Sequence, residues 1–199
     1  TEDITDLETL NDYARVNLSA AAVTITDNTL NFSDIQSIVD LKNNLGDGDH
    51  NTQLRSTSTL TIDIDISTFN TYITGTHPKL TLSNCKVVFE SGRTPTVAEV
   101  NIIRGKTTNT ITGSIVDTET IDQLETITAQ GNNIYTVTIP SEDDASKIKD
   151  VISRVGNNGV VDMTNVTALS GSSTDIVSIY GENASRFTIN TVNTLNTGI

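Results

Sequence analysis

Residues 120–139, which read TIDQLETITAQGNNIYTVTI, contain the pattern that decides the fold. Thr120 and Gln123 form a capping box, in which each side chain binds a backbone N–H that the first turn of a helix leaves unpaired. Apolar residues then recur with helical spacing until Gly and Asn at 131–133 end the helix. Residues 134–139 are rich in the Thr, Val and Ile of strands. The stretch predicts a short helix followed by a strand.

The same order recurs along the chain. Capping pairs occur about every 28 residues, the first sign of a repeat architecture. The strong pairs are Thr5 with Glu8, Ser33 with Gln36, Thr96 with Glu99 and Thr120 with Gln123, and the weaker ones are Ser67 with Asn70, Ser141 with Asp144 and Ser172 with Asp175. Strand-like segments follow at residues 110–116, 134–139, 160–169 and 187–192. Each unit therefore reads cap, helix of two or three turns, Gly/Asn stop, strand.

Such short helices and single strands cannot bury their apolar sides alone, but stacked copies can. We therefore predict an α/β repeat solenoid in which the strands form a parallel sheet and the helices pack on it. The alternative is an all-β solenoid or sandwich in which the helical stretches are only turns.

The predicted domain organisation is a single repeat array over residues 1–199. Residues 94–185 hold the most regular repeats, and an uncapped C-terminal strand covers 186–199. Residues 45–93 are irregular: 60–66 alternate as a strand, but the β-branched and aromatic residues of 71–74 make a poor helix after Ser67. We expect a turn or an extra hairpin there.

Composition narrows the function. The chain has 199 residues, of which 12 are Lys or Arg and 25 are Asp or Glu, giving a net charge of −13, and 35% are hydrophobic. Thr, Asn and Ser together supply 71 residues. The acidic charge argues against nucleic acid as a partner. No apolar run approaches the length of a membrane helix, so we predict no membrane insertion. These properties suit an extracellular protein.

The residue types that carry chemistry are scarce. Cys85 is alone and only His50 and His77 could act as imidazole bases, so we predict no catalytic residues, no enzymatic activity and no cofactor. Calcium is the one candidate ligand. Residues 46–51, GDGDHN, look like part of a calcium loop, and Asp63 and Asp65 fall on one strand face; a polar turn and a solvated face are the alternatives.

The acidic residues at 142–144, together with Asp122 and Asp175, fall in the first turns of predicted helices. Negative side chains are favourable there because the helix dipole is positive at its start. We therefore interpret these carboxylates as capping groups rather than as a catalytic cluster.

Two segments carry a family resemblance. Residues 97–113, VAEVNIIRGKTTNTITG, resemble the Thr-rich tandem repeat of very large surface proteins of marine cyanobacteria and other bacteria, and of structural proteins of their phages. Residues 160–176 are similar to the companion strand-to-helix part of that repeat, and the resemblance extends over 94–185. Asn109 replaces the usual Gly. The resemblance implies an extracellular, non-enzymatic structural role and transfers no functional residues.

Three functions follow as expectations. The first is a self-assembling structural protein of a cell-surface layer, adhesin or filament, at the cell surface or outside the cell. The others are a virion fibre or decoration protein and a carbohydrate-binding module. Because the chain begins at Thr1 without a leader, we expect a mature product or a fragment of a longer protein. The expected partners are copies of the chain, stacked head to tail, or further repeats of a longer chain.

Overall fold

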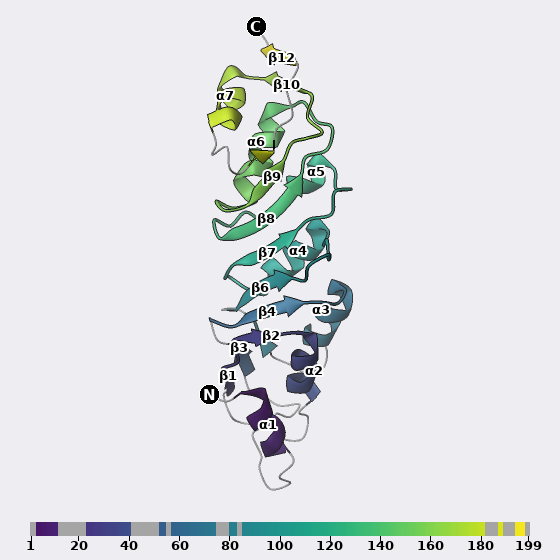
Figure 1. The fold of residues 1–199 in the computed structure, drawn as a ribbon, viewed down its shortest axis with the longest axis vertical. Coiled ribbons are helices and arrows are strands. Elements are labelled where there is room, and N and C mark those ends of the chain that lie inside the picture. Colours follow the sequence, from purple (N-terminus) through teal and green to yellow (C-terminus); the bar gives the residue numbers. More distant parts are fainter. Residues whose placement is uncertain are drawn as a thin grey trace. The chain divides into compact units, whose positions relative to one another are not determined.

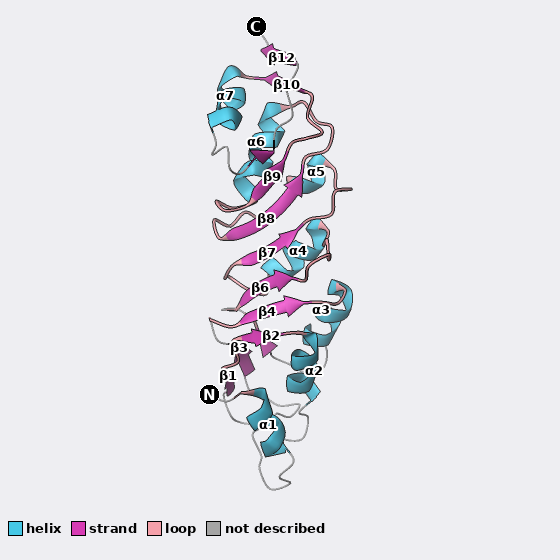
Figure 2. Ribbon diagram, in the orientation of Figure 1, coloured by secondary structure: helices cyan, strands magenta, loops and turns pink. Residues whose placement is uncertain are grey.

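A computed structural model of the chain describes residues 3–11, 23–40, 52–54, 57–74, 80–82, 85–181, 187–188 and 194–197. Helices alternate with short strands that pair in parallel (Figures 1 and 2). The predicted mixed α/β class with a parallel sheet is confirmed, and the helices exclude the all-β alternative. The chain divides into two compact units, which are described separately.

Unit 1 comprises residues 1–91 and 102–110. Strands β2, β4 and β6 pair side by side in parallel, and β1, β3 and β5 form a second parallel sheet. The elements described here are α1 (Ile4–Asn11), β1 (Val23–Ile25), β2 (Thr29–Leu30), α2 (Phe32–Asp40), β3 (Thr52–Leu54), β4 (Thr59–Ile62), α3 (Ile66–Thr74), β5 (Leu80–Thr81) and β6 (Lys86–Phe89).

Unit 2 comprises residues 92–101 and 111–199. Its strands β7, β8, β9 and β11 pair in parallel in that order, and β10 pairs with β12. The elements described here are α4 (Val97–Arg104), whose residues up to Asn101 belong to this unit, β7 (Ile111–Ser114), α5 (Ile121–Leu124), β8 (Asn133–Thr138), α6 (Ala145–Arg154), β9 (Val160–Asp162), β10 (Ala168–Gly171), α7 (Ser173–Gly181), β11 (Phe187–Thr188) and β12 (Thr194–Thr197).

Three of the predicted helix caps are confirmed. Thr120 and Gln123 form both bonds of a capping box, and Thr96 with Glu99 exchanges the same two bonds. Before α7, the N–H of Asp175 donates to the Ser172 hydroxyl, which donates in turn to the Asp175 carboxylate. These side chains satisfy the first backbone N–H groups of α5, α4 and α7.

The other four caps are carried by neighbouring Asp or Asn residues. The N–H of Asp6 donates to Asp3, that of Asp34 to Asn31, that of Thr68 to Asp65 and that of Ser146 to Asp144. The predictions of Thr5, Ser33, Ser67 and Ser141 as caps were therefore wrong. Asp and Asn cap helices as well as Ser does, so the search for Ser or Thr selected the wrong position.

The prediction of a turn or an extra hairpin in place of a helix after Ser67 was wrong, because this segment forms helix α3. Residues 66–74 are helical although several are β-branched or aromatic. Ile66 and Phe69 are fully buried, and the rings of Phe69 and Phe32 lie 6.3 Å apart. Burial of these side chains outweighs the few tenths of a kcal/mol by which such residues disfavour a helix.

Helix α5 is shorter than predicted, with four residues instead of two or three turns. The Asn101 side chain accepts a hydrogen bond from the Thr128 N–H and donates one to the Thr126 carbonyl. Those backbone groups are thus bound by a side chain of α4 rather than by the next turn of α5. This capture ends the helix although Ile127 continues the apolar spacing.

Two segments expected as single strands each contain two. Residues 160–169 divide into β9 and the start of β10, because the Asp162 carboxylate accepts from the Thr164 N–H and turns the chain. The described part of 186–199 contains β11, which pairs with β9, and β12, which pairs with β10.

The cores of both units are built from small aliphatic residues. In six of the helices, the fourth residue after the cap is buried. These residues are Ile35, Phe69, Val100, Leu124, Ile148 and Ile176. Strand registers align further buried residues across the sheets: Leu30 lies beside Leu60 and Leu60 beside Val87 in unit 1, and Val137 lies beside Val161 in unit 2. Each helix and its strands therefore contribute a thin apolar layer.

We predict that Gly156→Ala destabilises the protein more than Gly92→Ala or Gly131→Ala. Gly156 has a φ of 87°, and a Cβ there would lie 1.9 Å from the Asn133 carbonyl oxygen. Gly92 has the same φ with open space around it. We expect Gly92→Ala to cost about 1–2 kcal/mol from backbone strain alone, and Gly156→Ala at least about 1–3 kcal/mol more from the overlap.

Urea unfolding of the two variants and of Gly131→Ala measures these costs. Gly131 has neither a positive φ nor an atom near its added Cβ, so its substitution serves as the neutral control. Equal midpoints for Gly92→Ala and Gly156→Ala would contradict the steric argument.

Candidate functional site

Of the residues predicted as candidates for calcium binding, the structure describes Asp63 and Asp65. Residues 46–51 lie outside the described part of the chain. Asp63 is exposed after β4, whereas Asp65 accepts the Thr68 N–H at 2.7 Å and caps α3. The prediction that both lie on one strand face was wrong, because β4 ends at Ile62.

A shallow polar hollow of about 380 Å³ contains Asp63. Asp34 and Glu90 also line it, so three carboxylates share the hollow. The Asp34 carboxylate accepts the Asn31 N–H at 2.8 Å and so completes the cap of α2. No group of three His, Cys, Asp or Glu residues among those described is arranged to hold a metal ion.

The acidic residues 142–144 precede helix α6. The Glu142 carboxylate accepts the N–H groups of Asp143 and Asp144, and Asp144 itself caps the helix. The Asp143 carbonyl accepts the Ser170 N–H. This cluster holds the entry to α6 in place and ties it to β10.

Cys85 is buried in unit 1. Burial raises the pKa of its thiol to about 12, against a smaller opposite effect of a backbone hydrogen bond. Nucleophilic cysteine chemistry requires the thiolate, so this thiol is inert at neutral pH.

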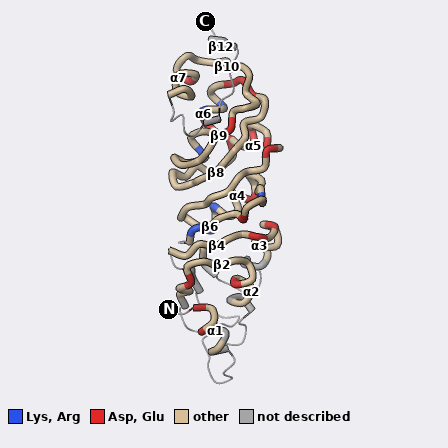
Figure 3. The backbone as a smooth tube through the Cα atoms, in the orientation of Figure 1, with Lys and Arg blue, Asp and Glu red and all other residues tan. Residues whose placement is uncertain are grey.

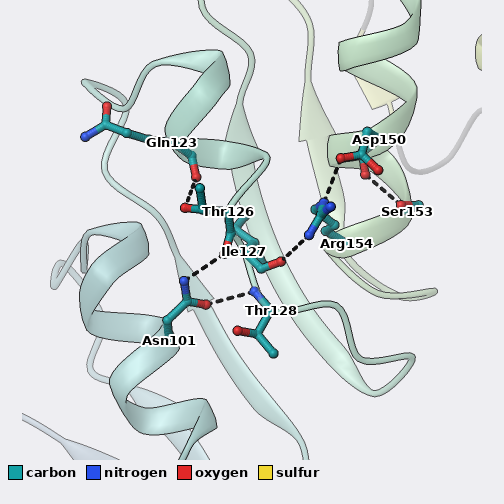
Figure 4. A network of polar contacts seen from close by, with 8 residues as sticks. All are labelled: Asn101, Gln123, Thr126, Ile127, Thr128, Asp150, Ser153 and Arg154. Atoms are coloured by element: carbon teal, nitrogen blue, oxygen red, sulfur yellow. Dashed lines mark hydrogen bonds and ion pairs between the residues drawn. The ribbon is translucent and has the colours of Figure 1, made fainter.

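The most developed polar arrangement in unit 2 joins neighbouring helices through side chains (Figure 4). Asn101 of α4 binds the backbone at both Thr126 and Thr128 beyond α5, at 2.9 and 2.8 Å. Arg154 of α6 donates to the Ile127 carbonyl at 2.9 Å and to Asp150 of its own helix at 2.8 Å. Residues 126–128 are therefore held from both sides.

The buried side-chain amide of Asn133 adds two further hydrogen bonds to this network. The Asn133 side chain, at the start of β8, donates to the carbonyls of Thr128 and Arg154. In unit 1 the buried Thr107 hydroxyl donates to the Cys85 carbonyl. Amide and hydroxyl side chains thus bind backbone carbonyls of residues that lie outside the strands.

Ion pairs connect α6 to the helices on both sides. Lys147 Nζ lies 2.8 Å from the Asp122 carboxylate of α5, and Lys149 Nζ lies 2.6 Å from that of Asp175 on α7. The Lys149 bond is the main cause that lowers the pKa of Asp175, with the Ser172 hydroxyl second. The Asp122 bond raises the pKa of Lys147. Asp122 and Asp175 therefore link helices, which their predicted capping role did not include.

Two carboxylates accept a hydrogen bond from the N–H at the start of a helix that lies 22 or 23 residues earlier in the sequence. Glu119, only 6% exposed, accepts the Val97 N–H at 2.7 Å, and Asp27 accepts the Ile4 N–H at 3.1 Å. Both add negative charge at the positive end of a helix dipole. Sequence reasoning missed them because it sought caps adjacent to each helix. Asp and Glu recur near the helix labels in Figure 3.

A second hollow, of about 500 Å³, lies between α4 and α5. Hydroxyl and amide side chains line it together with Glu119, namely Thr96, Asn101, Thr118, Gln123 and Thr126. The side chains of Thr96, Asn101, Glu119 and Gln123 are engaged in the bonds described above. The hollow is therefore framed by groups that hold the fold.

Comparisons with known proteins give no relative. The chain matches no protein-family model, no curated protein and no solved structure. Within the described residues, no helix has the length and apolar character needed to cross a bilayer.

We predict that Glu119→Leu destabilises unit 2 by about 1–3 kcal/mol, because it leaves the buried Val97 N–H without its acceptor. Glu119→Gln retains an oxygen at that place and is the matched control. Thermal unfolding at neutral pH compares the two, and an equal loss in both variants would contradict the capping role.

We predict a pH-dependent link between α6 and α7. The folded-state pKa of Asp175 is lowered, so its contribution is present above the ordinary pKa of 3.8 and is lost as the pH falls through the folded value. In Lys149→Met we expect this pKa to rise but to stay partly lowered, since the Ser172 hydroxyl bond persists. Carboxyl NMR titration measures the shift, and an unchanged pKa would contradict the link.

Proposed function

We propose that this chain is a non-enzymatic, extracellular structural protein that self-assembles, built as a solenoid of stacked strand–helix units. It serves in a cell-surface layer, an adhesin or a filament. Its partners are other copies of itself or further repeats of a longer chain.

The observation that carries the proposal is a recurring link between segments about one unit apart. Side chains bond to groups 22 to 31 residues away, at Glu119, Asp27, Asn101, Lys149, Arg154 and Ser58. Strand registers advance by a similar step, from Val23 to Thr52 and from Thr136 to Val160. Contacts limited to neighbouring units are the property that defines a solenoid.

The helix starts support the same repeat. The caps at Asp3, Asn31, Asp65, Thr96, Thr120, Asp144 and Ser172 are spaced by about 28 residues on average. The burial of the fourth residue after six of these caps follows the same spacing. A unit that repeats in both capping and burial is suited to extension by further units.

The use of the polar residues supports a structural role. Thr, Asn, Ser and acidic side chains cap helices, bind backbone carbonyls and link neighbouring helices, as set out above. The resemblance of residues 94–185 to Thr-rich surface-protein repeats, together with the net charge of −13, supports a place outside the cell. A phage structural protein is the alternative that shares this resemblance.

Strand edges support association with further units. In unit 1, β2 pairs with β4 and no other described strand lies beside it; in unit 2, β11 pairs likewise with β9 alone. Among the described strands, β2 and β11 are thus the edges of their sheets, and the N–H and C=O groups of a sheet edge are the groups through which strands of another chain add.

We predict that antibodies against this chain label the surface of intact cells that express it, without permeabilisation. Negative-stain imaging of the purified chain at high concentration should show ordered multimers. Labelling of phage particles instead would favour the virion alternative. Labelling only after permeabilisation would contradict the extracellular role, and a strictly monomeric chain would contradict self-assembly.

A further inference from the structure

Helix α7 exposes two large apolar side chains on one face. Val177 is 67% exposed and Tyr180 is 51% exposed, while Ile176 and Ile179 of the same helix are buried. Residues three apart lie on the same face of a helix, so the two exposed side chains are neighbours.

The equivalent face of α6 is covered by α7. Counted from their caps, Lys149 and Ile152 of α6 occupy the positions of Val177 and Tyr180. Ile152 is only 4% exposed, and Lys149 binds Asp175 of α7. Asn101 holds the position of Lys149 on α4, and it also bonds to the segment of the next helix. In unit 2 this face is the one through which a helix contacts its successor.

Unit 2 also has a strand at the edge of its sheet, as far as the described strands extend. Strand β11 lies at the edge of its sheet, with Phe187 beside Val161 and Val161 beside Val137. Unit 2 therefore presents an apolar helix face together with the end of an apolar strand row.

Unit 1 presents the matching pair of elements. Strand β2 is at a sheet edge, where Leu30 starts the row that continues with Leu60 and Val87. Helix α1 packs against α2, and its exposed Asp6 stands at the same place after its cap as Asp175 does on α7.

We propose that α7 and β11 of one copy dock on α1 and β2 of a second copy, in a head-to-tail contact. In this contact, α7 of the first copy packs on α1 of the second copy in the way that α6 packs on α7. Strand β11 of the first copy pairs in parallel with β2 of the second, so that Phe187 lies beside Leu30. Because the two contacting surfaces differ, the contact repeats from copy to copy and builds an open array. The inference rests on the proposed self-assembly and names its contact surface.

The first experiment measures the mass of the full chain by sedimentation over a concentration series. We expect the wild-type mass to rise with concentration and the double variant Val177→Asp/Tyr180→Asp to associate at least tenfold more weakly. The control Ala129→Asp/Gln130→Asp adds the same charges at exposed positions outside the helices of unit 2 and should match the wild type. Wild-type association by the α7 variant would overturn the proposal.

Substituting Val177 with a positive or a negative residue tests whether α1 of the second copy is the helix that contacts α7. Lys at position 177 would reach Asp6 of the second copy as Lys149 reaches Asp175, and its methylene stem would still cover apolar surface. We expect Val177→Lys to retain association and Val177→Asp to lose it. Loss in both variants, or equal retention, would overturn the choice of α1.

Thiol cross-linking with a short bis-maleimide, which spans more than a disulfide does, separates this contact from a twofold one. The double variant Val177→Cys/Asp6→Cys should form a ladder of covalent multimers, whereas neither single variant should cross-link. Native Cys85 can stay, since it is buried with its pKa raised to about 12. Covalent dimers from Val177→Cys alone would indicate α7 against α7 and overturn the head-to-tail contact.

The outcomes also separate this inference from the proposed function. Ordered wild-type multimers that the α7 variants leave unchanged overturn the contact and leave self-assembly standing. A wild type that is monomeric at every concentration overturns both, while surface labelling of intact cells tests the extracellular role by itself. Circular dichroism confirms that each variant is folded.

Discussion

The unpaired N–H groups at the start of each short helix are the constraint on which this structure depends. A helix of about two turns leaves four such donors and has few internal bonds to offset them. Here side chains satisfy them in two ways: a cap next to the helix, such as Thr120 or Asp144, and a carboxylate from a later segment, such as Glu119 for Val97. The second way makes the helix start a tertiary contact.

This constraint explains a composition that first suggests a weak core. Only 35% of the residues are hydrophobic, and each helix and its strands bury a thin layer. Stability must then come also from polar groups that join one segment to the next. Asn101, Asn133 and Arg154 do so by binding backbone carbonyls, and Lys147 and Lys149 by pairing with acids of adjacent helices. Part of the acidic surplus thereby serves the fold.

The same arrangement gives the proposed function its physical basis. When each segment is bonded mainly to the one before and after it, the ends offer the kind of surface that lies between the segments. In the proposed contact, helix α7, with Val177 and Tyr180 exposed, and the edge of β11 form this surface. In the proposed solenoid, further units extend the array by repeating the same contacts.

The sequence by itself determined the alternation of helix and strand and three of the caps, because capping pairs and helical spacing act within a few residues. It misplaced the caps at Asp3, Asn31, Asp65 and Asp144, since several neighbouring polar residues are equally able to cap. Only the tertiary structure decided that residues 66–74 are helical, through burial of Phe69, and that α5 ends at Leu124, through Asn101. These outcomes depend on groups distant in sequence, which local patterns do not contain.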